Sequence, residues 1–368
     1  MTTYLLAGGG TAGHVNPLLA TADRLRERDP GAVVLVLGTK EGLESRLVPA
    51  RGYELLTIPK LPFPRRPDAA ALRFPGRLRA SVAAVRAMIR DRQVDVVVGF
   101  GGYAAAPAYL AARTESTPIV VHEANARPGI ANRLGAAFTR HVGTVFEGTR
   151  LKNSRVVGMP LRVEIERLDR VAAREEAREF FSLSADRPTL LVTGGSSGAK
   201  SINGAVSTSI SAILGTGWQV LHVTGEWRDE VVDPGLDGYR VIKYCDRMDL
   251  ALALADLSLG RSGTGTVVEV TALGIPAVFV PYPVGNGEQR LNARGAVEAG
   301  GALLVDDAAL TPAWVRGTLV PLLNDRARIA EMAVRSRAVG ALDGADRTVD
   351  LIESALGDAS GSLAGTAK

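Results

Sequence analysis

The chain has 368 residues, more than one ordinary hydrophobic core accommodates, and this length predicts two domains of roughly 150–200 residues each. Its 46% apolar and 22% charged residues are typical of a globular protein, and its one cysteine, Cys245, excludes an internal disulfide framework. Because no apolar run approaches the ~20 residues of a membrane-spanning helix and no signal peptide is evident, we expect a cytoplasmic protein.

Strands and helices are predicted to alternate along the whole chain, which is the pattern of parallel α/β sheets. In the first half, the expected strands are residues 4–7, 33–37, 94–98, 119–122 and 142–145, and the expected helices are residues 17–28, 78–90 and 104–113. In the second half, the expected strands are residues 190–192, 219–223, 257–259 and 277–280, and the expected helices are residues 201–214, 248–255, 266–273 and 289–299.

The domain boundary is expected near Arg162. A last strand of the first half is predicted within residues 156–161, where Gly158 and Pro160 interrupt regular structure and lead into a linker. We therefore predict two Rossmann-like domains that face one cleft. They span residues 1–162 and 163–357, with a last helix able to pack back on the first domain, and a polar disordered tail follows at 358–368.

Residues 8–13 form a glycine-rich turn between the first strand and the first helix. Glycine allows positive φ and close backbone approach, and a helix entered in this way presents unpaired N–H groups to an anion such as a phosphate. The turn matches G-x-G-x-x-G, so an NAD-dependent oxidoreductase is an alternative. That fold places an acidic residue at the end of the second strand, where only Glu41 stands, and one NAD leaves the glycine turn at 194–199 unexplained.

His14 stands at the start of the helix that follows this turn. The helix dipole disfavours a cationic imidazole at this position, and a neutral imidazole can take a proton from a hydroxyl. A polar residue that caps the helix is the alternative, and we interpret His14 as a general base. The other histidines show no metal-ligand spacing with one another or with Cys245, so no metal site is predicted.

Two further loops of the first half follow expected strands. Tyr103 comes after Gly101 and Gly102, and Asn125 comes shortly after the strand at 119–122. Because ligands of open α/β sheets bind at the carboxyl ends of the strands, these loops are expected to meet the first glycine turn at one crevice. Taken singly, each is an ordinary connection; the prediction depends on their shared position.

Three segments of the second half fit a nucleotide sugar. The turn at 194–199 resembles the first glycine turn, and residues 261–269 open a helix with Ser, Gly and Thr donors suited to a diphosphate. Glu269, one turn further, can accept both hydroxyls of a ribose, and Glu288 beside Gln289 suits neighbouring sugar hydroxyls. Each segment has an alternative as ordinary helix-capping residues.

Residues 60–92 carry nine basic residues against two aspartates, with Leu61, Phe63, Leu72, Phe74 and Leu78 interleaved among them. Such a segment favours an anionic membrane surface, and a solvated loop and helix is the alternative. Nucleic acid is not expected as a partner, because the segment has no aromatic stacking ladder and no known reading motif.

In order and spacing, these motifs resemble the MurG family from about Thr3 to about Gly340. The resemblance is carried by residues 8–14, 101–103, 122–125, 157–162, 194–199, 261–269 and 288–292. It implies a GT-B fold and an inverting, metal-independent and cofactor-independent transferase that moves N-acetylglucosamine from UDP-N-acetylglucosamine to the muramyl 4-hydroxyl of undecaprenyl-linked lipid I in peptidoglycan synthesis. It also implies a peripheral location on the cytoplasmic face of the cell membrane, with cell-wall synthesis proteins as candidate partners.

The resemblance also implies residue roles. His14 would deprotonate or orient the acceptor hydroxyl, and the acceptor would be bound by Thr11, Gly13, Tyr103 and Asn125. The donor would be bound by Arg162 from the linker, Gly195 and Ser196 with Thr264, Gly265 and Thr266 at the diphosphate, Glu269 at the ribose, backbone near Cys245 at the uracil, and Glu288 and Gln289 at the sugar.

Four positions depart from the family pattern. Ala124 and Ala126 stand where Gln and Gly are common, Glu288 where a Gln occurs in some relatives, and Lys200 where Arg is frequent. Three rival functions stay open at this point. They are a transferase of the same fold with another lipid or metabolite acceptor, a UDP-N-acetylglucosamine 2-epimerase, and a non-enzymatic nucleotide-sugar sensor. An epimerase is expected to place more carboxylates and histidines in its cleft.

Overall fold

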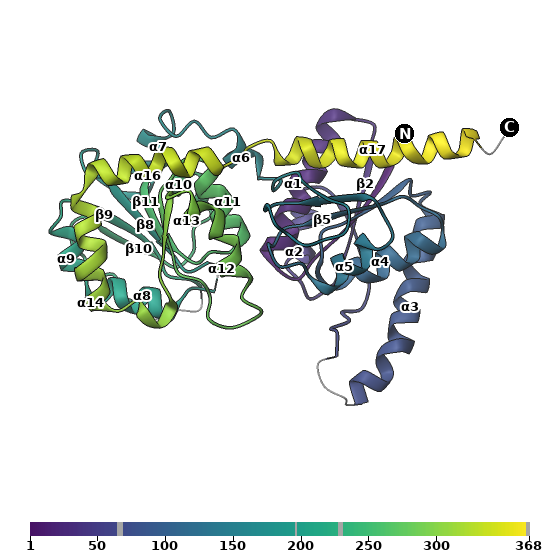
Figure 1. Cartoon of the computed structure of the whole chain (residues 1–368), viewed down its shortest axis with the longest axis horizontal. Coiled ribbons are helices and arrows are strands. Elements are labelled where there is room, and N and C mark those ends of the chain that lie inside the picture. Colours follow the sequence, from purple (N-terminus) through teal and green to yellow (C-terminus); the bar gives the residue numbers. More distant parts are fainter. Residues whose placement is uncertain (65–68, 196, 227–230, 366–368) are drawn as a thin grey trace. The chain divides into compact units, whose positions relative to one another are not determined.

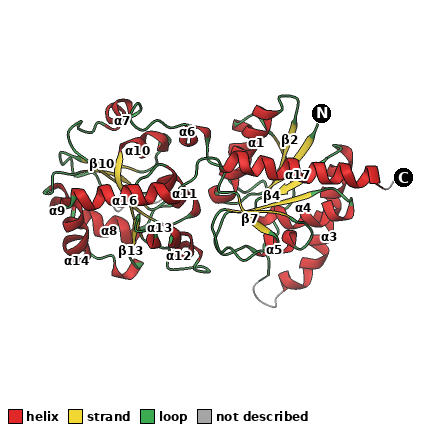
Figure 2. Ribbon diagram, turned by 45° about the horizontal axis from the view of Figure 1, so that its top comes forward, coloured by secondary structure: helices red, strands yellow, loops and turns green. Residues whose placement is uncertain are grey.

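The computed structural model describes residues 1–64, 69–195, 197–226 and 231–365. They form two compact units: residues 1–162 with the chain from Leu342 onward, and Val163–Ala341 (Figure 1). Each unit is a parallel β-sheet with helices against its faces (Figure 2). The predicted α/β class with two Rossmann-like domains is confirmed.

The sheet of the first unit has seven strands, all paired in parallel, in the order β3-β2-β1-β4-β5-β6-β7. The strands are mostly short runs rich in Val, Leu and Ile, which parallel sheets covered on both faces require. Their bounds are β1 Thr3–Ala7, β2 Val33–Gly38, β3 Glu54–Thr57, β4 Val96–Gly99, β5 Ile119–Glu123, β6 His141–Thr144 and β7 Ser154–Val156.

The core of the first unit alternates across its sheet. In β1, Leu6 faces α1 and the C-terminal helix α17, whereas Leu5 faces α3 and α4. The two faces are therefore sealed by different helices, as period-two side-chain alternation requires. The helices are α1 Ala12–Arg28, α2 Glu44–Ala50, α3 Ala69–Asp91, α4 Gly102–Thr114, α5 Ile130–Ala136 and α17 Gly344–Gly365.

Three features of the first unit differ from the expectation. The last strand is β7, Ser154–Val156, and residues 157–161 continue as buried non-strand chain after it. The edge strand β3 and the seven-residue helix α2 were not predicted, because β3 has an exposed Glu54 and α2 is too short to show a helical period. Helices α1 and α3 begin at Ala12 and Ala69, five and nine residues before their predicted starts at 17 and 78.

The C-terminal segment packs on the first unit. From the sequence, we expected that the last helix could pack back on this domain. Residues from Leu342 onward belong to the first unit rather than to a second domain that extends to 357, and α17 continues to Gly365 through most of the expected disordered tail. Helix α17 buries Val349 and Ile352 in the first-unit core. Its acidic residues pair with basic ones of the same unit: Arg24 with Asp346, Arg28 with Asp346, Asp350 and Glu353, and Arg140 and His141 with Asp358.

The second unit repeats the architecture with six parallel strands in the order β10-β9-β8-β11-β12-β13. Its strands are β8 Thr189–Thr193, β9 Gln219–Val223, β10 Tyr239–Ile242, β11 Ala255–Gly260, β12 Ala277–Phe279 and β13 Ala302–Leu304. Its helices are α6 Val163–Glu166, α7 Arg174–Phe181, α8 Lys200–Thr208, α9 Ile210–Leu214, α10 Met248–Leu254, α11 Thr264–Ala272, α12 Glu288–Asn292, α13 Arg294–Glu298, α14 Pro312–Trp314, α15 Val320–Asn324 and α16 Arg326–Val339, with a 3-10 turn at Asp307–Ala309 and a π-turn at Val315–Leu319.

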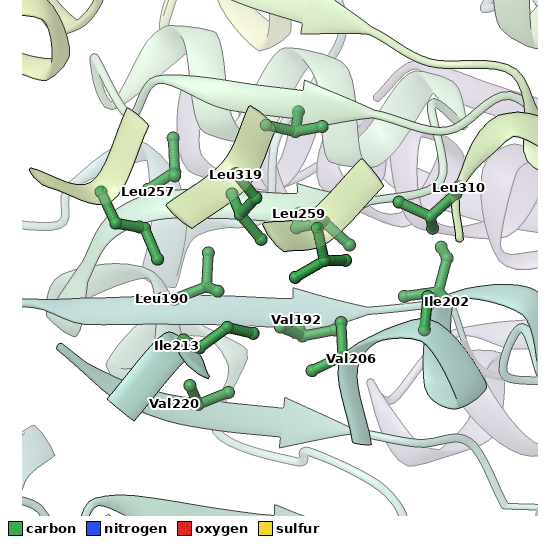
Figure 3. Close-up of a cluster of buried hydrophobic side chains, with 14 of the residues drawn as sticks. Leu190, Val192, Ile202, Val206, Ile213, Val220, Leu257, Leu259, Leu310 and Leu319 are labelled. Atoms are coloured by element: carbon green, nitrogen blue, oxygen red, sulfur yellow. The ribbon is translucent and has the colours of Figure 1, made fainter. Parts of the chain in front are cut away.

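A core of the second unit covers one face of its sheet and extends from β8 to the strands on either side of it, β9 and β11. Figure 3 shows Leu190 and Val192 of β8 among Ile202 and Val206 of α8 and side chains of the neighbouring strands. This packing fixes α8 against the sheet, so the residues before α8 form a tight turn at the carboxyl end of β8.

Candidate active site

The first unit brings the turns after β1 and β4 into contact. These neighbouring strands send α1 and α4 to opposite faces of the sheet, which makes their carboxyl ends a topological switch point. A Cβ on Gly102, which has φ +77°, would lie 2.4 Å from the Gly9 carbonyl oxygen. Only glycine fits there, so the two predicted glycine turns form one continuous backbone surface.

His14 lies in the first turn of α1, half-buried above this surface. Its Nδ1 lies 3.2 Å from the Gly9 carbonyl oxygen and 3.3 Å from Thr11 Oγ1. A carbonyl can only accept, so the Nδ1–H donates and Nε2 keeps its lone pair. Burial lowers the pKa of His14 below 6.5, although the nearby carboxylate of Glu123 and the Gly9 carbonyl oppose the shift. The imidazole is therefore neutral and able to accept a proton at Nε2.

Gly101 lets the turn after β4 approach the imidazole closely, since a Cβ on that residue would lie 3.1 Å from Nε2 and 3.4 Å from Asn132 Nδ2. Thr11 and Gly13 are exposed on either side of the same turn. Tyr103 is 37% exposed, and its ring lies 3.8 Å from the place where Gly10 would carry a Cβ. The structure thus brings Thr11, Gly13, His14 and Tyr103 together.

Glu123 ends β5 and organises the loop that contains Asn125. Its buried carboxylate accepts the backbone N–H of Asn125 at 2.9 Å, the N–H of Gly129 at 2.9 Å and Asn132 Nδ2 at 3.0 Å. Asn132 in turn accepts a hydrogen bond from the Tyr109 hydroxyl at 2.8 Å. Asn125 is half-buried at this loop, so its position depends on a buried polar network.

This network was not predicted from the sequence as a set of functional residues. Glu123 belongs to the motif at 122–125 without a role of its own, and Asn132 and Tyr109 carry no local signal. Tyr109 occupies the volume above two glycines: a Cβ on Gly99 would lie 2.0 Å from its hydroxyl oxygen, and one on Gly135 would lie 2.6 Å from its ring. In the sequence, only the glycines at these two positions indicate that a large side chain packs against the backbone there.

In the second unit, the glycine turn after β8 is compact. A Cβ on Gly194 would lie 2.3 Å from the Ala199 backbone nitrogen, and one on Gly225 would lie 2.3 Å from the Gly198 nitrogen. Gly195 has φ +81° and nothing within 4 Å of its Cβ position, so it faces open space. Ser196 lies outside the described residues.

Helix α11 begins at the carboxyl end of β11 with Thr264, Gly265 and Thr266. Thr264 is buried, and its Oγ1 lies 3.1 Å from Asn292 Nδ2 of α12, so this side chain joins two helices. Gly265, Thr266 and Glu269 are half-buried on the same helix. The predicted residues of this segment therefore all lie in the first two turns of α11. The Thr264 side chain in addition holds α11 to α12.

Arg261 joins four segments at this end of the second sheet. It pairs with Asp307 at 2.6 Å and donates to the carbonyls of Val280 and Pro281 at 3.1 and 3.2 Å and to Ser201 Oγ at 3.2 Å. Arg261 lies within a predicted motif that assigns it no role. Its contacts fix the ends of β11 and β12 relative to α8.

Glu288 and Gln289 are both half-buried at the start of α12. Gln289 Oε1 accepts the backbone N–H of Tyr282 at 2.9 Å, which fixes the loop before α12. Cys245 is buried in the chain between β10 and α10. Arg162 is half-buried at the end of the long N-terminal segment of the first unit.

Among the described residues, no group of three or more His, Cys, Asp or Glu side chains could hold a metal ion. His122 contacts the Gly158 carbonyl oxygen at 3.0 Å, and His222 lies between Tyr239 and Asn203 at 2.8 and 3.1 Å. Within the same part of the chain, no helix is both long and apolar enough to cross a membrane.

Comparison with known proteins decides the family. Residues 4–144 match the glycosyltransferase family 28 N-terminal domain, and residues 189–348 match the family 28 C-terminal domain. The UDP-N-acetylglucosamine–N-acetylmuramyl-(pentapeptide) pyrophosphoryl-undecaprenol N-acetylglucosamine transferase of Leifsonia xyli subsp. xyli is 65% identical over 356 residues, 97% of this chain and 99% of that protein. The same-named Streptomyces coelicolor protein is 49% identical over 96% of this chain and 98% of its own length. The chain belongs to the MurG family.

The MurG family assignment agrees with the fold. The crystal structure of Acinetobacter baumannii MurG has a TM-score of 0.77 and 29% identity, over 96% of this chain and all of that chain. The UDP-GlcNAc 2-epimerase of Neisseria meningitidis has a TM-score of 0.69 but only 15% identity, over 96% of this chain and all of that chain, so that likeness is one of fold alone. This MurG-family chain is a glycosyltransferase with the GT-B fold, as the motifs predicted.

Proposed function

We propose that this chain transfers N-acetylglucosamine from UDP-N-acetylglucosamine to the muramyl 4-hydroxyl of lipid I and so forms lipid II for peptidoglycan. The observation that carries the proposal is the 65% identity, over 97% of the chain, to a protein named for this reaction. The neutral His14 at a glycine-lined surface supports it, because the reaction needs a base for a hydroxyl. Roles in cell shape and cell division would follow from this product.

His14 Nε2 takes the proton of the acceptor hydroxyl as its oxygen attacks the anomeric carbon of the donor sugar. The bond between that carbon and the diphosphate oxygen breaks, and UDP leaves with the electron pair, so the anomeric configuration inverts. Thr11, Gly13, Tyr103 and Asn125 are the proposed acceptor contacts, since they surround His14 or follow the next strand of the same sheet edge. Gly101 places no Cβ against Nε2, where one would lie 3.1 Å away, and this suits an incoming hydroxyl.

The second unit is the proposed donor site. Gly195 and Ser196, with Gly265, Thr266 and the backbone of Thr264, are assigned to the diphosphate, because two helices begin there and unpaired N–H groups stabilise an anion. Glu269 is assigned to the ribose, backbone near Cys245 to the uracil, Glu288 and Gln289 to the sugar, and Arg162 to the nucleotide. This donor set gives the leaving UDP a stabilising environment that requires no metal ion or cofactor.

We propose that the α3 surface, defined as Phe63, Leu72 and Phe74 with Arg73, Arg77 and Arg79, rests on the anionic cytoplasmic face of the cell membrane. Phe63 and Leu72 are 59% and 86% exposed, and the rings of Phe63 and Phe74 pack together with centroids 5.0 Å apart. Arg86 and Arg90 instead pair with Glu115, so their charges are paired within the protein and they are left out of the α3 surface. Residues 65–68 of that segment lie outside the described residues.

The test is transfer of radiolabel from UDP-N-acetylglucosamine to a lipid I analogue, with EDTA present and UDP-glucose as a competing donor. Transfer that survives EDTA and prefers the acetamido sugar supports the donor, the reaction and the metal independence together. UDP binding without transfer would redirect the search to another lipid or metabolite acceptor. Release of UDP with N-acetylmannosamine in the absence of acceptor would instead identify an epimerase.

A further inference from the structure

Glu44 is a buried carboxylate beneath the first glycine turn. It is 1% exposed and is the first residue of α2, which follows β2. Its Oε2 accepts the Gly10 backbone N–H at 2.8 Å, and its Oε1 accepts both the backbone N–H and the hydroxyl of Thr39 at 2.8 Å. The carboxylate therefore joins the end of β2 to the turn after β1.

Three glycines surround the Glu44 carboxylate, and a side chain at any of these positions would overlap it. A Cβ would lie 2.3 Å from Oε1 if placed on Gly9, 2.5 Å from Cγ if placed on Gly38, and 2.0 Å from Oε2 if placed on Gly42. Burial alone would raise the pKa of Glu44, but the donors of Gly10 and Thr39 outweigh it and hold the pKa below its ordinary value. Glu44 is thus an ionised, fully enclosed group at neutral pH.

One peptide group connects Glu44 to His14. The N–H of Gly10 and the carbonyl of Gly9 belong to the same peptide plane and point in opposite directions. The N–H donates to Glu44 and the carbonyl accepts from His14 Nδ1 at 3.2 Å. A negative charge at one end of such a chain polarises the peptide and makes its carbonyl a stronger acceptor.

We infer that Glu44 is a positioning residue for His14, acting through the Gly9–Gly10 peptide group to keep the imidazole proton on Nδ1 and the lone pair on Nε2. The inference rests on the proposed role of His14 as the base. It reproduces with an intervening peptide what a buried carboxylate does for a catalytic histidine in direct contact. Because the N–H of Gly10 donates to Glu44, it is not available to a substrate phosphate at this turn, which would bind other donors.

The charges near His14 set the direction of the pH test. Burial opposes its protonated form, whereas Glu123 of β5 and Glu44 of α2 both favour that form. Lys60 lies over the Tyr103 ring, with Nζ 5.2 Å from the ring centroid. Removal of the Glu44 charge therefore lowers the pKa of His14. The acid limb of the rate profile, where the base becomes protonated, moves to lower pH as a result.

The experiment compares Glu44→Gln with the matched control Glu41→Gln, an exposed glutamate three residues earlier. We expect Glu44→Gln to lower kcat about 10- to 100-fold with the donor KM little changed, and to shift the acid limb to lower pH. Glu41→Gln should match the wild type in all three. A Glu44→Gln protein with unchanged kcat, or with a lower kcat and an unmoved acid limb, would overturn the inference.

A measurement on the unmodified protein keeps the inference testable if the variant does not fold. The ¹⁵N chemical shifts of the His14 imidazole, assigned by comparison with a His14→Gln sample, report which nitrogen carries the proton. We expect protonated Nδ1 and unprotonated Nε2 above the pKa, and the opposite tautomer would overturn the inference. Absence of transfer by the wild type would instead count against the proposed function and leave this readout intact.

Discussion

His14 combines a hydrogen-bonded Nδ1, an Nε2 without a hydrogen-bond partner and a lowered pKa, and no other histidine does so in the described structure. We expect His14→Ala to lower kcat by about 10²–10⁴-fold, since a positioned general base contributes this much. UDP affinity, measured by calorimetry, should be nearly unchanged. A large loss of UDP affinity would make His14 a donor ligand instead.

The lowered pKa of His14 predicts the pH dependence of the reaction. The base must be neutral, so kcat should rise with pH through a pKa below the ordinary 6.5 and level off above it. Initial rates at saturating substrates between about pH 5 and pH 8, in buffers of constant ionic strength, would show this limb. A midpoint above 6.5 would contradict the burial that the structure assigns to this imidazole.

Tyr109 supports the Asn125 loop through Asn132 and Glu123. Tyr109→Phe keeps the ring between Gly99 and Gly135 but leaves Asn132 Oδ1 without this donor, at a cost of about 1–3 kcal/mol in the free energy of unfolding. If the loop contacts the acceptor, the acceptor KM should rise while the donor KM stays constant. Tyr282→Phe, at an exposed tyrosine of the second unit, serves as a control for stability.

Helix α3 exposes Leu72 near its N-terminal end, with 86% of that residue accessible, and Phe63 of the preceding chain is 59% exposed. We expect Phe63→Ser with Leu72→Ser to reduce sedimentation with vesicles rich in anionic lipid, because both side chains lie on the proposed membrane surface. The control is Val334→Ser on α16, which is 71% exposed in the other unit. Equal loss in the control, or no loss in the double variant, would place the membrane surface elsewhere.

Helix α17 is held to the first unit by both packing and charge. Ile352→Ala should lower the free energy of unfolding of this unit by about 2–4 kcal/mol, because it leaves a cavity in the buried core that α17 shares with the first sheet. Denaturant titrations of the wild type and the variant would measure this difference in the free energy of unfolding. The control is Ser354→Ala, an exposed position on the same helix, which should change the stability little.

Both units carry a buried neutral histidine in their sheets, His122 in β5 and His222 in β9, and burial lowers the pKa of each to about 4. The unfolded chain binds these protons from about pH 6.5 downward, whereas the folded chain binds them only near pH 4. Each histidine should therefore cost about 1.4 kcal/mol of stability per pH unit as the pH falls across that window. Denaturant titrations at about pH 7.5, 5.5 and 4.5 would measure the slope, and His222→Gln should reduce it in the second unit alone.

The sequence by itself determined the fold class and the family. Buried apolar strand runs, each ended by a glycine turn, fix a parallel sheet and its functional edge through local chemistry, since only glycine adopts those turns. For this reason His14, Tyr103 and the residues of α11 were found at the expected edge of their sheets. The motif spacing was enough to indicate the MurG family before any geometry was known.

Only the tertiary structure decided which residues support those edges. Glu44 lies in a helix too short to predict, and Tyr109 and Asn132 meet Glu123 across three elements, so their hydrogen bonds depend on packing and leave no local pattern. The place of α17 likewise depends on partners at α1, more than 300 positions earlier in the chain. Long-range contacts of this kind are set by the whole core, because a buried polar group must find its partner wherever the fold brings one within reach.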